Sequence, residues 1–136
     1  MLEKIVSNEN LLAIIIYRDY SCSGTQFLTP DSAPMQVGVI CHSAGYEIKP
    51  HLHVPFERHF QDTQEVLFIR KGKIQVDFYE GNKKFFVSRI IGAGDVILMV
   101  SGGHGLTVIE DIEMVEAKTG PFMGGSDKMQ LKPDTL

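Results

Sequence analysis

The chain has 136 residues, 43% of them hydrophobic, and a formal net charge of −4. This length fits one domain with a single core, so we expect one domain over residues 1–136. The negative charge and the lack of a basic block argue against a nucleic-acid partner. The longest apolar runs, Leu11–Tyr17 and Val96–Val100, are far shorter than the roughly 20 residues that a bilayer-spanning helix needs. No secretory signal pattern is seen, and we expect a cytoplasmic protein with no membrane partner.

Short apolar or alternating segments, bounded by turn residues, predict strands along most of the chain. In chain order the predicted strands are Leu11–Tyr17, Met35–Cys41, Glu47–Val54, Glu65–Arg70, Lys73–Glu80, Lys84–Ile91, Asp95–Val100, His104–Ile109 and Glu113–Lys118. Before them, Glu3–Glu9 is predicted as a short helical turn. No helical pattern of 10 to 15 residues separates the strands, so the predicted fold class is all-β, an antiparallel sandwich or barrel.

Two segments interrupt the strand pattern. Phe56–Thr63 is polar, follows directly after His53 and its neighbours, and is predicted to be a loop at the mouth of the barrel. The tail, residues 119–136, contains Gly120-Pro121 and Gly124-Gly125 and is predicted to be irregular.

The two cysteines, Cys22 and Cys41, do not form a C-x-x-C pair. A disulfide between them is one alternative, but in a cytoplasmic protein we expect reduced thiols.

Histidines and one glutamate form the pattern that bears most on function. His51 and His53 lie one residue apart on a predicted strand, so their side chains are expected to point the same way. Glu65 and His104 alternate in phase with apolar residues on their own predicted strands: Leu67 and Ile69 beside Glu65, and Leu106 and Val108 beside His104. Burying a carboxylate and imidazoles in an interior is costly unless something pairs with them, and a divalent cation would do so. The alternative is that these are ordinary surface histidines or hydrogen-bonded core histidines.

At this point the sequence resembles a known family. Gly45-x5-His51-x-His53 followed by Glu65-x6-Gly72 resembles the first motif of the cupins. Gly94-Asp95 followed by Gly102 and His104 resembles the second. The resemblance covers a motif core from about residue 35 to residue 118. It implies a small double-stranded β-barrel of the jelly-roll type, with His51, His53, Glu65 and His104 as metal ligands.

Further segments resemble one bacterial subgroup of small single-domain cupins that has no assigned activity. They are Thr63–Leu67, Gly120-Pro121-Phe122 and Asp127-Lys128.

The chain departs from the usual cupin motifs in two places. Eleven residues separate Glu65 from His53, whereas Glu57 has the short spacing of the usual glutamate. We favour Glu65 because it begins a strand and keeps the E-x6-G register, while Glu57 and a further alternative ligand, His59, lie in the polar loop. In the second motif, Val100 holds the usual proline position.

The leading functional prediction is a metal-dependent enzyme that acts on a small polar molecule inside the barrel. Nitrogen and oxygen donors suit Fe, Mn, Ni, Cu or Zn. Resemblance to cupins implies either a dioxygenase or a sugar isomerase or epimerase. The alternatives are a non-catalytic binding or sensing module with a bound metal and, as a weaker possibility, a purely structural metal. A homodimer is also expected, in which the apolar run Leu11–Tyr17 covers an exposed sheet edge.

Overall fold

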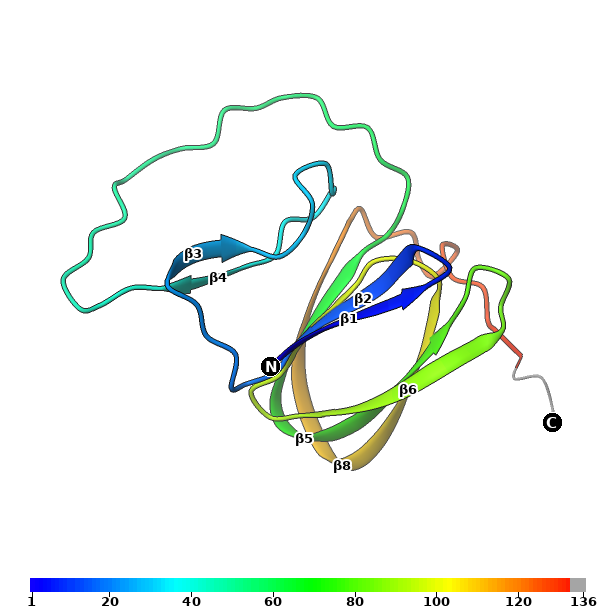
Figure 1. The fold of residues 1–136 in the computed structure, drawn as a ribbon. Coiled ribbons are helices and arrows are strands. Elements are labelled where there is room, and N and C mark those ends of the chain that lie inside the picture. The colour runs from blue at the N-terminus through cyan, green and yellow to red at the C-terminus, as the bar shows by residue number, and fades with distance from the viewer. Residues whose placement is uncertain (133–136) are drawn as a thin grey trace. The chain divides into compact units, whose positions relative to one another are not determined.

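The computed structural model describes residues 1–132, which form eight β-strands and no helix (Figure 1). The strands are β1 (Leu2–Ser7), β2 (Asn10–Ile16), β3 (Gly24–Phe27), β4 (Gly38–Cys41), β5 (Glu65–Tyr79), β6 (Phe85–Gly92), β7 (Val96–Met99) and β8 (Gly103–Lys118). Every strand pairing is antiparallel. The predicted all-β antiparallel class is therefore confirmed, whereas the jelly roll stays a prediction. The described residues contain no helix with the length and apolar character needed to cross a membrane.

The chain forms two compact units, each described by itself. Among the described residues, the large unit comprises residues 1–20 and 63–132, and the small unit comprises Ser21–Asp62. The large unit holds a six-stranded sheet, and the small unit holds the two-stranded sheet of β3 and β4. That one domain unites the two units stays a prediction.

β5 is the centre of the large unit. Along one edge β5 pairs first with β7 and then with β6, while β8 pairs with it along the other edge. β2 lies between β1 and β7, which gives the order β1-β2-β7-β5-β6. Because β5 and β8 are long and strongly curved, the sheet curls into a half-barrel (Figure 1).

Gly72 permits the bend of β5 against β8. Its φ is +81°, and a Cβ placed there would lie 2.0 Å from the backbone oxygen of Asp111. Side chains other than glycine avoid this backbone region, and there is no room for one here. The pairing of β5 with β8 shifts register on both sides of this point.

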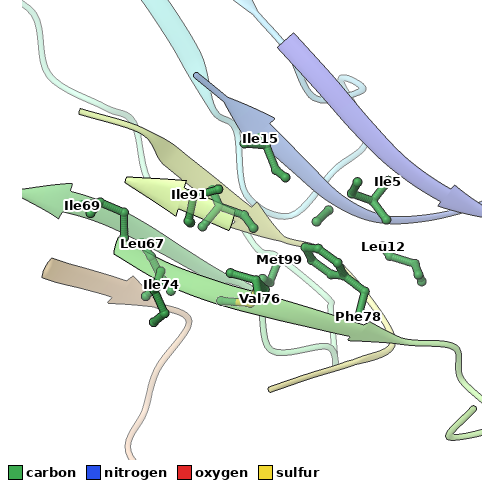
Figure 2. Packing of buried hydrophobic residues seen from close by; sticks show 12 residues of the cluster. Ile5, Leu12, Ile15, Leu67, Ile69, Ile74, Val76, Phe78, Ile91 and Met99 are labelled. Carbon is green, nitrogen blue, oxygen red and sulfur yellow. The ribbon is translucent and has the colours of Figure 1, made fainter. Parts of the chain in front are cut away.

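Alternating apolar residues of the large unit fill the inside of the curled sheet (Figure 2). The cluster consists of Ile5, Leu12, Ala13, Ile15, Leu67, Ile69, Ile74, Val76, Phe78, Ile91, Ile97 and Met99. Burial of apolar surface at roughly 25 cal/mol per Å² makes this cluster the main source of the large unit's stability.

The Gly94-Asp95 pair joins three segments of the large unit. The buried Asp95 carboxylate accepts hydrogen bonds from the backbone N–H groups of Arg18 (2.8 Å) and Gly92 (2.7 Å). Gly94, with φ +91°, donates its N–H to the carbonyl of Ile69 (2.8 Å). The Gly94-Asp95 pair therefore fixes the β6–β7 turn.

Several predicted elements need correction. The helical turn predicted at Glu3–Glu9 is wrong, because Leu2–Ser7 forms β1, paired with β2. Tertiary pairing outweighs local propensity there. β2 is an interior strand of the sheet, so Leu11–Tyr17 is not free to cover an edge of a second copy. β3 was not predicted.

The strand predicted at Glu47–Val54 is also wrong, because these residues belong to no strand. The loop predicted at Phe56–Thr63 is confirmed, and so is the irregular tail over residues 119–132. The predicted tail continues through residues 133–136, which lie outside the described residues. The four predicted strands on either side of Gly72 and Asp111 form two long strands, β5 and β8.

Candidate functional site

Glu65 and His104 lie together in the large unit. His104 Nε2 is 3.2 Å from Glu65 Oε2, and the two side chains are 32% and 11% exposed, respectively. Glu65 lies on the same face of β5 as Leu67 and Ile69, as the alternation along the strand predicted, and both of these residues are buried in the core cluster. The sequence thus predicted correctly that a carboxylate lies at the edge of an apolar interior.

The strand pairing explains how two residues far apart in sequence meet. Glu65 begins β5 and pairs with Met99, the last residue of β7. The chain then turns through Val100 and Gly102 and enters β8, where His104 is the second residue. Gly102 has φ +71°, and a Cβ there would lie 2.3 Å from the carbonyl oxygen of Tyr79, so this turn requires glycine.

The interior-facing phase predicted for His104, Leu106 and Val108 on β8 is wrong, because all three residues are exposed. Leu106 is 39% exposed and Val108 is 55% exposed, so neither side chain lies in the interior as the alternation suggested. The curled sheet buries the central strands more fully than β8, which among residues 1–132 pairs with β5 alone.

The charges around Glu65 favour its ionised form. The hydrogen bond from His104 lowers the pKa of the Glu65 carboxyl, and partial burial opposes this effect. The positive charges of Lys118 and Lys128 lower the pKa further. Glu65 is therefore a carboxylate at neutral pH, which is the form that binds a cation.

Gln64 places an unsatisfied polar atom next to this pair in sequence. Its side chain is buried, with 4% of the residue exposed, and its Oε1 atom has no hydrogen-bond partner. Its Nε2 atom donates to the carbonyl of Val100 in the β7–β8 turn (3.5 Å). A buried acceptor without a partner costs about 1–3 kcal/mol, so an enclosed water is the natural partner for this amide oxygen.

His51 and His53 form a second pair of imidazoles, in the small unit. Their ring centroids are 5.4 Å apart and the rings are nearly perpendicular. Both residues are exposed and lie outside any strand, and His51 Nδ1 is 2.9 Å from the carbonyl oxygen of Lys49. The rings are therefore neighbours, as predicted, but the alternation of a strand is not the reason.

The two alternative ligands, Glu57 and His59, contact each other. His59 Nε2 is 3.4 Å from Glu57 Oε2, and both side chains are about nine-tenths exposed. Water already solvates the exposed Glu57 carboxylate, so it does not carry the desolvation cost that a cation would offset at the buried Glu65.

Each unit thus contributes one pair of the predicted donors. Within either unit, the described residues include no group of three or more His, Cys, Asp or Glu side chains that could hold a metal ion by themselves. That the His51–His53 pair and the Glu65–His104 pair bind one ion stays a prediction.

A polar hollow of about 410 Å³ lies beside the β7–β8 turn in the large unit. Its lining residues are Ser7, Asn8, Asn10, Leu12, Glu80, Gly81, Asn82, Ser101 and Gly102. The Glu80 carboxylate accepts hydrogen bonds from Ser7 Oγ and from Asn8 Nδ2. The sequence analysis did not find this hollow, because turn residues signal loops without showing which loops meet.

Comparison of the chain with models of protein families, with curated proteins and with solved structures found no match.

Proposed function

We propose that the chain is a metal-binding protein of the cupin type, with His51, His53, Glu65 and His104 as ligands, and that it acts as an enzyme on a small polar molecule. The observation that carries this proposal is the Glu65–His104 pair, a carboxylate at the edge of an apolar interior next to an imidazole. Such donors suit Fe, Mn, Ni, Cu and Zn.

The two side chains of the pair are close enough that both would be able to hold one ion. The separation between His104 Nε2 and Glu65 Oε2 is 3.2 Å. A cation bound by both residues would replace the hydrogen bond that His104 now donates to Glu65.

A bound divalent ion would supply Lewis acidity or redox chemistry. The protein's own contribution is charge. The ionised Glu65 supplies negative charge at the site.

Elemental analysis of protein purified without added metal tests the proposal. We expect about one transition-metal ion per chain, and we expect His51→Ala and His104→Ala each to remove most of it. Glu57→Ala is the matched control and should leave the occupancy nearly unchanged. If Glu57→Ala removed the metal and Glu65→Ala did not, the choice of carboxylate would be reversed. Wild-type protein that binds no transition metal even when it is supplied in excess would refute the proposal.

Three outcomes separate the possible roles. Oxygen uptake by the iron-loaded protein with a candidate substrate indicates a dioxygenase. Conversion of a sugar without oxygen uptake indicates an isomerase or epimerase. A ligand that is held tightly and recovered unchanged after long incubation indicates a non-catalytic binding or sensing module.

We also propose a cytoplasmic homodimer, although not through Leu11–Tyr17, since β2 is paired on both sides within the chain. Exposed apolar residues of β6, Phe85 and Ile90, offer another contact surface. Light scattering coupled to size-exclusion chromatography should give the mass of two chains, and the mass of one chain would contradict the dimer.

A further inference from the structure

Two free thiols meet in the small unit. Cys22 Sγ is 3.4 Å from Cys41 Sγ, although 19 positions separate the residues in sequence. Both cysteines are half-buried, so small molecules can reach them.

The pairing of β3 with β4 brings the two sulfurs together. Gly24 begins β3 and pairs with Cys41, the last residue of β4. Gly24 has φ +74°, a conformation natural to glycine, and it turns the chain just after Cys22. This turn and the pairing of Gly24 with Cys41 place the Cys22 thiol in contact with the Cys41 sulfur.

Hydrogen bonds make the two thiols unequal. The Cys41 sulfur accepts from the backbone N–H and the thiol of Cys22 and lies 3.7 Å from Ser21 Oγ, and these contacts lower the pKa of Cys41. Partial burial raises the pKa of Cys22, whose thiol also has the carbonyl of Val39 within reach (3.4 Å). Cys41 therefore ionises first, and the thiolate is the nucleophilic form of cysteine.

We propose that Cys22 and Cys41 form a redox-active dithiol site, in which Cys41 attacks a low-molecular-weight disulfide and Cys22 resolves the product into an intramolecular disulfide. The site is independent of the proposed metal-dependent activity. Oxidation covalently joins the start of β3 to the end of β4 in a unit that has few buried side chains.

The exchange balances in two steps. The Cys41 thiolate attacks one sulfur of the small disulfide, whose S–S bond breaks, and one small thiolate leaves with the electron pair and takes up a proton. Cys22 then loses its proton and attacks Cys41 Sγ, which expels the second small thiolate. The protein loses two hydrogen atoms, and the small disulfide is reduced to two thiols.

Oxidised glutathione is the probe, added to the reduced full-length protein, with alkylation and intact mass measurement at each time point. We expect a monomer that is lighter by two hydrogen atoms, retains no glutathione and returns to the original mass with dithiothreitol. A stable glutathione adduct on the wild-type protein, or a disulfide-linked dimer, would overturn the proposal.

Single variants test the order of attack. Cys22→Ser should trap a stable mixed disulfide between Cys41 and glutathione, because the resolving thiol is gone. Cys41→Ser should react about tenfold more slowly, because the remaining thiol has the higher pKa. The double variant should show no mass change. Equal rates for the two single variants would contradict the assignment of Cys41 as the attacking residue.

Discussion

The two units of this chain bury their side chains very differently. Of the 17 hydrophobic residues that are buried among the described residues, Leu28 is the one that belongs to the small unit. The large unit has strands of up to 16 residues, whereas β3 and β4 have four residues each and contain no buried residue. An apolar core therefore holds the large unit, and other contacts must hold the small one.

Local polar contacts order much of the small unit. The Gln36 amide donates to the carbonyls of Pro30 (2.9 Å) and Ala33 (3.1 Å), and its oxygen accepts from Thr29 Oγ1 (3.0 Å). Each such hydrogen bond contributes about 0.5–1.5 kcal/mol, less than a buried Leu or Ile side chain does. Short-range contacts of this kind define a turn, but they do not bury an apolar face.

The comparison shows when an alternating pattern becomes a strand. Both Glu65–Ile69 and Glu47–Val54 alternate, but only the first finds partners within its own unit, β7 and β8. In Glu47–Val54, Leu52 is 81% exposed and Val54 is 74% exposed. Periodicity predicts a strand only if a neighbouring strand and a core are available to cover it.

Replacing Gly72 should break the large unit most severely. Gly72→Ala would place a Cβ 2.0 Å from the backbone oxygen of Asp111 in a left-handed conformation, and we expect a loss of about 4 kcal/mol or more in the free energy of unfolding. Urea denaturation followed by circular dichroism measures the loss. Gly81→Ala is the control, because a Cβ there meets no atom within 4 Å, and its effect should stay within about 0.5 kcal/mol. Equal effects of the two substitutions would contradict this account of the β5 bend.

A matched pair of leucines compares the two units directly. Leu67, which is 0% exposed, lies in the core cluster, so Leu67→Ala should cost about 2–5 kcal/mol. Leu52 is 81% exposed in the small unit, so Leu52→Ala should lower the free energy of unfolding by less than about 0.5 kcal/mol. The urea midpoints of the two variants measure these losses in stability. A large loss of stability in Leu52→Ala would show that the small unit has a core of its own.

The smallest effect concerns an ion pair on the large unit. The hydrogen bond from Arg89 lowers the pKa of Glu3. The Glu3–Arg89 pair therefore stabilises the fold above the unfolded-state pKa near 4.5, and this stabilisation is lost as the pH falls through the lower folded-state pKa. Glu3→Gln should therefore lower stability at pH 7 by less than about 1 kcal/mol, and the difference from wild type should shrink below pH 4. Urea midpoints across this pH range measure it, with the exposed Glu9→Gln in the β1–β2 turn as control. A deficit that stays constant down to pH 3 would show that charge is not its cause.

The sequence by itself determined that the strands are antiparallel, where β2 and β4 to β8 lie, and that Glu65 shares the buried face of Leu67. These features depend on alternation and turn residues, which are local properties that one strand displays alone. The resemblance to the cupin motifs also drew attention to Gly72 and Gly94, and the structure shows a positive φ at both.

Tertiary structure decided the rest. It decided that Leu2–Ser7 pairs as β1, that Glu47–Val54 has no strand partner, that Gln64 is buried with an unpartnered oxygen, and that two cysteines 19 positions apart are in contact. Each of these outcomes depends on which distant segments meet and on the apolar surface that their meeting buries, and a pattern within one short segment carries no record of either.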